Sequence, residues 1–232
     1  MDSALSFANS LDRLTRWIGK AAGWLMLPLI AVIVFDVVTR KIDFTRLLFS
    51  DFTMASGYSV STILQDLEWH FHGALLLLSF GFGYLANAHV RVDVFRELLP
   101  RRKQAWMELF ALVFMALPAL TVLLWYSGLL FELSWAQWEG SDSLTGIGWR
   151  WFIKFFMPLG FVFAYLAVIA TLIRLIAFLF GDEHLQLKAV EGLEIFADDH
   201  AALDAARKAA EEALRAEAER EKAHHHHSDG ER

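Results

Sequence analysis

The fold of this chain is decided by residues 155–180, which read FFMPLGFVFAYLAVIATLIRLIAFLF. A helix rises about 1.5 Å per residue, so this apolar run is long enough to cross a bilayer core of about 30 Å. Three more apolar stretches precede it, at residues 21–38, 71–88 and 109–131. The first two are short but remain within the length that a membrane span needs. The sequence therefore predicts an all-α integral membrane protein with four transmembrane helices.

The composition also favours a membrane protein. The 232 residues are 56% hydrophobic and include 9 Trp and 20 Phe, whereas an apolar share of about 45–50% is typical of soluble domains. Trp rings collect at the membrane surface, and five of them lie at or near the ends of the predicted spans: Trp17, Trp69, Trp106, Trp149 and Trp151. The chain has no cysteine, which excludes disulfides, thiolate catalysis and Cys-ligated metals.

The charges divide the chain into two parts. Residues 1–180 contain 14 Lys or Arg and 13 Asp or Glu, whereas residues 181–232 contain 7 and 14. We therefore expect a transmembrane domain at residues 21–180 and an acidic, Ala/Glu-rich cytoplasmic tail at residues 181–232. The tail has no sustained heptad, so a solvated or transiently docked helix is favoured over a partner-binding coiled coil.

Short amphipathic segments occupy the start of the chain and the connections between spans. In residues 1–20, Leu11, Leu14 and Ile18 share one helical face, which predicts an interfacial helix leading into the first span. Similar faces occur in the first and second loops, formed by Ile63, Leu64 and Leu67 and by Val92, Phe95 and Leu99. We expect two or three short helices to lie flat at the membrane surface.

Lys and Arg near the span ends predict the orientation, because cytoplasmic loops carry an excess of both. With the N-terminus inside, ten such residues lie on the cytoplasmic side: Arg13, Arg16, Lys20, Arg91, Arg96, Arg101, Arg102, Lys103, Arg174 and Lys188. Five lie on the outer side: Arg40, Lys41, Arg46, Arg150 and Lys154. The sequence therefore predicts that both termini are cytoplasmic.

The histidines do not suggest a cofactor site. His72 and His89 are 17 residues apart, which is about 25 Å along a helix, and the other three predicted spans contain no histidine. A haem held by two histidines therefore lacks a second ligand at matching depth. The four-histidine run at residues 224–227 lies in a polar tail with nothing to orient it. No cofactor, metal site or catalytic residue is expected.

Few charged groups lie inside the predicted spans. Asp36 is near the outer end of the first span, and Arg174 is in the inner part of the fourth. A transporter that binds ions or anions by itself needs several converging polar groups at mid-depth. We therefore expect no translocation path within this chain alone.

Four short motifs resemble one known family. They are LQDLEWH at residues 64–70, HVRVDVF at 89–95, LLPR at 98–101 and MPLG at 157–160. Together they look like the small membrane subunit, of the DctQ type, of tripartite ATP-independent periplasmic (TRAP) transporters. The likeness covers roughly residues 15–180. Its most specific part is the His-Val-x-Val-Asp block followed by Leu-Pro between the second and third spans.

The resemblance implies a scaffold subunit in the bacterial inner membrane, with neither enzyme activity nor a nucleic-acid partner. A large membrane subunit of such a system carries the substrate and ion sites. A periplasmic binding protein delivers the substrate, usually a carboxylate solute, and a sodium gradient usually drives uptake. The first loop, residues 43–65, is longer than in compact members and resembles the branch associated with 2-oxo acids and hydroxy acids. The alternative function is a membrane anchor of a redox enzyme, which the histidine positions disfavour.

Six residues are candidates for structural or partner contacts: Glu68, Trp69, His89, Asp93, Glu108 and Arg174. His89 and Asp93 are one helical turn apart, which fits either a proton relay or a structural helix cap. Arg174 lies about 9 Å inside the end of its span, where it either snorkels to the surface or pairs with an acid. Glu108 is the acidic partner that we expect this chain to offer at that depth.

Overall fold

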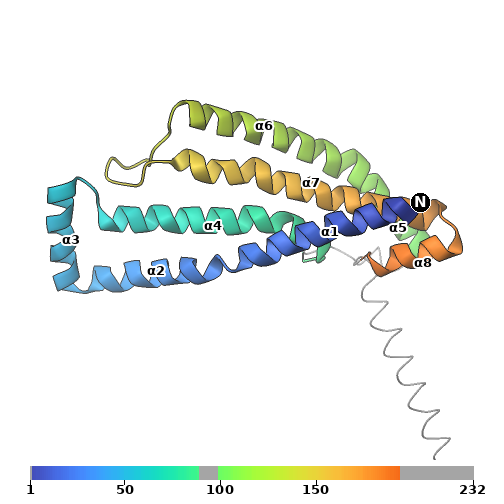
Figure 1. The fold of residues 1–232 in the computed structure, drawn as a ribbon, viewed down its shortest axis with the longest axis horizontal. Helices are drawn as coiled ribbons and strands as arrows, with labels where there is room; N and C mark the ends of the chain where they lie inside the picture. The colour runs from blue at the N-terminus through green and yellow to red at the C-terminus, as the bar shows by residue number, and fades with distance from the viewer. Residues whose placement is uncertain (1, 89–98, 194–232) are drawn as a thin grey trace, which may run out of the picture. The chain divides into compact units, whose positions relative to one another are not determined.

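The computed structural model describes residues 2–88 and 99–193. All regular secondary structure in this part of the chain is helical, as predicted (Figure 1). The elements are α1 (Asp2–Gly23), α2 (Met26–Lys41), α3 (Asp43–Ser56), α4 (Val60–Leu85), α5 (Arg101–Ala111), the π-helical turn η1 (Leu112–Ala116), α6 (Leu117–Ala136), α7 (Arg150–Phe180) and α8 (Glu183–Glu191). Residues 1–192 form one compact unit, which includes all of these elements, and residues 193–232 form another.

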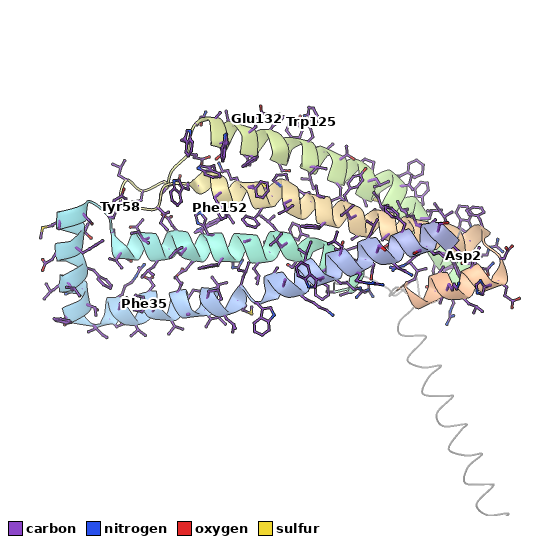
Figure 2. All side chains as sticks on the ribbon, in the orientation of Figure 1. Asp2, Phe35, Tyr58, Trp125, Glu132 and Phe152 are labelled. Atoms are coloured by element: carbon purple, nitrogen blue, oxygen red, sulfur yellow. The ribbon has the colours of Figure 1, made fainter. Side chains whose placement is uncertain are left out.

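Helices α4 and α7 form the centre of the bundle (Figure 1). α1 packs against both of them, α2 packs against α4, and α6 packs against α7, while α3 lies across the ends of α2 and α4. Side chains project outward along both flanks, among them Phe35 on α2, which is 51% exposed, and Trp125 on α6, which is 68% exposed (Figure 2). Exposed apolar surfaces of this extent face lipid or another protein.

Three of the described helical segments are long and apolar enough to cross a membrane. They are residues 2–41, 101–136 and 150–180, and they contain the predicted first, third and fourth spans. α4 contains most of the predicted second span and is 26 residues long. It is less apolar than the other three, because Gln65, Asp66, Glu68, His70 and His72 all lie in its first half.

Two prolines explain where the long helices are interrupted. Proline lacks an N–H, and its ring clashes with the carbonyl group four residues earlier. For Pro28 that residue is Trp24, and a turn at Trp24 and Leu25 separates α1 from α2. For Pro118 that residue is Phe114, which lies in η1, where a wider π-helical turn joins α5 to α6.

Helix α1 contains the N-terminal helix that was predicted at residues 1–20. It packs against α4 and α7 and buries one face, made of Leu5, Ala8, Thr15, Gly19 and Ala22. These residues follow the three- and four-residue spacing of a single helical face. The apolar face that the sequence analysis selected is a neighbouring one, and its Leu14 is 44% exposed.

The other predicted surface helices also differ in position. Ile63, Leu64 and Leu67 belong to the first turns of α4 rather than to a separate helix. α3 is the helix of the first loop, and none of its residues is buried. The predicted face of Val92 and Phe95 lies outside the described residues.

Helices α4 and α7 approach each other closely because glycine faces the neighbouring backbone. A Cβ atom added to Gly160 on α7 would lie against the carbonyl oxygen of Leu77 on α4. A Cβ atom added to Gly81 on α4 would lie 2.6 Å from the carbonyl oxygen of Phe163 and 2.5 Å from Cγ2 of Thr15 on α1. Small residues at such crossings allow membrane helices to pack backbone against backbone.

We predict that Gly81→Ala and Gly160→Ala each lower the free energy of unfolding by about 1–3 kcal/mol, because overpacking forces the helices apart. Gly128→Ala on α6 is the control, since an added Cβ there meets no atom within 4 Å. It should leave stability unchanged or raise it slightly, because Ala favours helix over Gly. Thermal unfolding of the purified protein in detergent measures both effects. An equal change in the free energy of unfolding for Gly160→Ala and Gly128→Ala would contradict the close packing of α4 against α7.

Candidate functional site at the two ends of the bundle

A buried arginine organises one end of the bundle. Arg174 on α7 is only 4% exposed. Its guanidinium donates to Oδ1 of Asn9 at 2.9 Å, to Oδ1 of Asp12 at 3.2 Å and to the carbonyl oxygen of Gly192 at 3.0 Å. These contacts join α7 to α1 and to the residue that follows α8. We call Asn9, Asp12, Arg174 and Gly192 the Arg174 cluster.

A second arginine extends the Arg174 cluster to α4. Nε of Arg16 donates to Oδ2 of Asp12 at 3.0 Å, and Nη2 donates to the carbonyl oxygen of Leu85 at 3.0 Å. Leu85 is the last residue of α4, so Arg16 binds at the negative end of the helix dipole. Asp12 thus bridges two arginines, and a single carboxylate connects α1 with α7 and, through Arg16, with α4.

The predicted pairing of Arg174 with Glu108 is wrong, because Asp12 is the acid that Arg174 contacts. Glu108 instead accepts a hydrogen bond from Oη of Tyr84 at 3.3 Å, which links α5 to the end of α4. The sequence predicts a surface helix at residues 1–20. A helix in that position would keep Asp12 away from the depth of Arg174.

A carboxylate also organises the opposite end of the bundle. Asp66 on α4 accepts hydrogen bonds from the backbone N–H of Ile147 at 2.8 Å and from Oγ of Ser141 at 3.2 Å. The backbone N–H of Ser59, which caps the start of α4, donates to the carbonyl oxygen of Thr145 at 2.9 Å. The loop of residues 137–149 is therefore attached to the first half of α4.

Two ion pairs connect this loop to the start of α7. Lys154 pairs with Glu139, and Arg150 pairs with Asp142. The Lys154 ammonium group and the hydroxyl of Ser134 both donate to Glu139, and they hold the pKa of its carboxyl below the ordinary value of 4.5. The hydrogen bond from Arg150 likewise lowers the pKa of the Asp142 carboxyl.

An aromatic cluster surrounds these ion pairs. The Trp135 and Trp151 ring centroids are 4.3 Å apart, and Trp138 lies 5.6 Å from Trp135 and 5.9 Å from Trp151. At the same end of the bundle, Asp36 on α2 is 5% exposed and accepts from Arg40 at 2.7 Å and from Oγ of Ser61 on α4 at 3.2 Å. Ionic contacts and Trp rings together are typical of the level where a protein meets the lipid headgroups.

The sequence-predicted candidates are spread over both ends. Trp69 is 74% exposed and lines a pocket of about 310 Å³ between α4, α6 and α7. Glu68 is half-buried on the same end of α4. His89 and Asp93 lie outside the described residues. The sequence does not predict the roles of Asp12, Asp66 and Glu139. Asp66 is part of the LQDLEWH motif, which was the available signal for it.

Between the two ends of the bundle, some polar side chains bind their own helix, and the hydroxyls of Thr121 on α6 and Tyr165 on α7 meet at 3.5 Å. Oγ1 of Thr171 donates to the carbonyl oxygen of Ala167 at 3.0 Å, and Oγ of Ser127 donates to that of Leu124 at 2.9 Å. Within residues 2–88 and 99–193, no group of three or more His, Asp or Glu is placed to hold a metal ion. The arrangement can fix helices to one another at both ends.

Comparison with known proteins identifies one family. A model of the DctQ component of tripartite ATP-independent periplasmic transporters matches residues 29–178. No curated protein and no solved structure matches the chain. The matched region begins in α2 and ends near the end of α7, so it covers most of the bundle.

We predict that Asp12→Asn and Arg174→Gln each destabilise the protein by about 3–5 kcal/mol, because each leaves a buried charge without its partner. A double-mutant cycle should give a coupling energy above about 1 kcal/mol for Asp12 and Arg174. The same cycle with Glu108→Gln and Arg174→Gln is the control, and its coupling should be below about 0.5 kcal/mol. Thermal unfolding provides the measurement. A larger coupling for Glu108 than for Asp12 would restore the original pairing.

A pH dependence follows from the lowered pKa of Glu139. Its ion pair stabilises the fold above the ordinary glutamate pKa of 4.5, and this contribution is lost as the pH falls through the lower pKa of the folded state. Glu139→Gln should therefore cost about 0.5–1 kcal/mol at pH 7, and the difference from wild type should vanish well below pH 4.5. Glu132→Gln is the control, since no ion-pair partner of Glu132 lies in the described segments. If the difference in unfolding free energy between Glu139→Gln and wild type persists at low pH, the ion pair of Glu139 is not its cause.

Proposed function

Because the chain belongs to the DctQ component family of tripartite ATP-independent periplasmic transporters, we propose that it is the fixed, non-translocating subunit of a system that imports an organic acid or similar carboxylate. It is a multi-pass membrane protein and a transporter component rather than an enzyme. This assignment replaces the alternative of a redox-enzyme anchor. The proposed partners are a large membrane subunit with the substrate and ion sites and a periplasmic binding protein, with a sodium gradient as the driving force.

One observation carries the scaffold role. The interhelical ion pairs of the described segments lie toward the two ends of the bundle. Between these ends, Thr171 and Ser127 bind their own helix, and the hydroxyls of Thr121 and Tyr165 meet at 3.5 Å between α6 and α7. A translocation path needs polar groups that converge near the middle of the membrane. A bundle fastened at both ends, with apolar flanks, is suited to support a moving neighbour and not to move itself.

We further propose that α4 is a fourth transmembrane helix. Its 26 residues correspond to about 39 Å, and it lies alongside α2 and α7 (Figure 1). Residues 69–88 contain no Asp, Glu, Lys or Arg. Lys154 and Arg174 on the neighbouring α7 are 20 residues apart, about 30 Å, which matches a bilayer core. Four spans place both termini on one side, and the Lys and Arg excess favours the cytoplasmic side of the bacterial inner membrane.

Helix α3 supports the same orientation as a helix at the outer surface. It lies across the ends of α2 and α4 (Figure 1) and leaves apolar residues uncovered, with Phe44 73% and Leu47 65% exposed. An amphipathic helix in this position suits the membrane interface. Together with the loop of residues 137–149, it forms the face on which we expect the binding protein to dock.

The function is tested by separating binding from uptake. We expect the isolated chain to bind no organic acid in calorimetry, since residues 2–88 and 99–193 bring no cluster of charged groups together at mid-depth. Uptake of labelled organic acids into cells should require this chain together with the large subunit and the binding protein. The large subunit should also co-purify with this chain. Micromolar binding of an organic acid by the chain alone would contradict the scaffold role.

The topology is tested by single-cysteine labelling, for which the absence of native cysteine gives a clean background. Ser50→Cys and Leu144→Cys should react with an impermeant reagent added outside intact inner-membrane preparations that are right side out. Lys103→Cys and Ala209→Cys should react only after the membrane is opened. Ser50, Leu144 and Lys103 are all exposed in the structure. Labelling of Lys103→Cys from outside would reverse the orientation.

A further inference from the structure

An open groove of about 480 Å³ lies beside the Arg174 cluster, between α1 and α7. Its lining is strongly basic: Arg13, Arg16 and Lys20 on α1 and Arg174 on α7, against the single carboxylate of Asp12. Asp12 already accepts from Arg16 and Arg174. The groove therefore keeps an excess of positive charge after its internal ion pairs are formed.

The excess charge sits on two side chains that are available to a ligand. Arg13 and Lys20 are exposed, and the described residues offer neither of them a hydrogen-bond or ion-pair partner. Arg16 and Arg174 are held in place by the contacts described above, so they form a fixed floor. Arginine and lysine N–H groups in such a cluster are suited to the oxygen atoms of a phosphate.

The groove lies at the depth of the lipid headgroups. Lys20 and Arg40 are 20 residues apart along α1 and α2, which is about 30 Å and equals the thickness of a bilayer core. Arg174 is at the same separation from Lys154 on α7. Since Arg40 and Lys154 lie at the end with the Trp cluster, the groove lies at the opposite membrane surface.

The same helix carries exposed apolar residues on the side away from its basic residues, with Trp17 between the two sides. Phe7, Leu11, Leu14 and Ile18 follow helical spacing on a face next to the buried one, and Phe7 is 55% exposed. Trp17 lines the groove itself and is 69% exposed. A basic face and an exposed apolar face on one helix are the pattern of a helix that binds an anionic membrane surface.

We propose that this groove binds the headgroup of an anionic phospholipid such as phosphatidylglycerol. The phosphate lies between Arg13 and Lys20, the Trp17 ring packs on the glycerol region, and the acyl chains follow the apolar face of α1. The continuous apolar face favours a lipid over a soluble anion, because a free phosphate gains nothing from it. Bound lipid neutralises the exposed cations beside the Arg174 cluster and so stabilises the docking of α1.

The test compares three probes on the purified, delipidated full chain in detergent. Dioctanoyl phosphatidylglycerol should raise the melting temperature by several degrees. Dioctanoyl phosphatidylcholine, which has the same chains and no net charge, and sodium phosphate should have little effect. The response to phosphatidylglycerol should weaken in high salt, which screens charge. Native mass spectrometry should show the lipid bound to the chain.

Matched variants locate the site. Arg13→Gln/Lys20→Gln should need about tenfold more phosphatidylglycerol for the same stabilisation, since each cation near an anionic lipid contributes to binding. Arg13→Lys/Lys20→Arg keeps both charges and should respond like wild type within about threefold. Lys41→Gln/Lys103→Gln removes two exposed cations elsewhere and should also respond like wild type. The melting temperatures without lipid verify that all three variants fold.

Four results would overturn the proposal. An unchanged lipid response in Arg13→Gln/Lys20→Gln would remove the groove as the binding site. Equal stabilisation by sodium phosphate would identify a soluble anion as the ligand. Equal stabilisation by phosphatidylcholine would show that the acyl chains, and not the charged headgroup, stabilise the protein. Loss of co-purification of the large subunit from that variant, with its lipid response intact, would assign the groove to an acidic surface of the partner.

Discussion

The buried guanidinium of Arg174 is the constraint on which the rest of the bundle depends. Arginine stays charged inside a protein, and a charge removed from water is costly unless it is paired and hydrogen-bonded. α7 therefore requires Asn9, Asp12 and the carbonyl of Gly192 around it. Meeting this need brings α1 back along α7, which places Thr15 against Gly81 and binds Arg16 to the end of α4. As a result α1 packs against both central helices, α4 and α7, in addition to α2 on α4 and α6 on α7.

The bundle separates its interactions by depth. Ions, hydrogen bonds and Trp rings hold the two ends, where water or headgroups are near, while close backbone contacts at Gly81 and Gly160 hold the middle. Polar pairs at the ends define which helices are neighbours, because they are directional. Close packing in the middle adds van der Waals contact that lipid chains cannot replace. A body built in this way has few internal degrees of freedom, which suits the fixed subunit that we propose.

The sequence predicts the spans well and the tertiary contacts poorly, for a physical reason. Length and hydropathy report on the bilayer, so residues 109–131 and 155–180 lie within the observed helices, and the family motifs led to the correct family. Pro28 and Pro118 also indicate two interruptions, at Trp24 and at the π-helical turn that contains Phe114, because each of these residues lies four positions before a proline. The pairing of Asp12 with Arg174 was not predictable, because helical periodicity says which face a residue occupies and not which distant helix covers it. The amphipathic pattern of residues 1–20 has two faces, and only the folded bundle shows which of them is buried.

The Arg174 cluster also imposes an order on biosynthesis. Asp12 and Arg174 are 162 residues apart, so at about 5–20 residues per second the ribosome adds Arg174 roughly 8–30 s after Asp12. During that interval α1 has no arginine on α7 to bind, and its basic, amphipathic surface keeps it at the membrane where it emerged. Until α7 is made, α1 can contact α4 alone, through Thr15 at Gly81 and Arg16 at the carbonyl of Leu85. A nascent chain that stops before α7 leaves Asn9 and Asp12 without the arginine that they bind in the finished bundle.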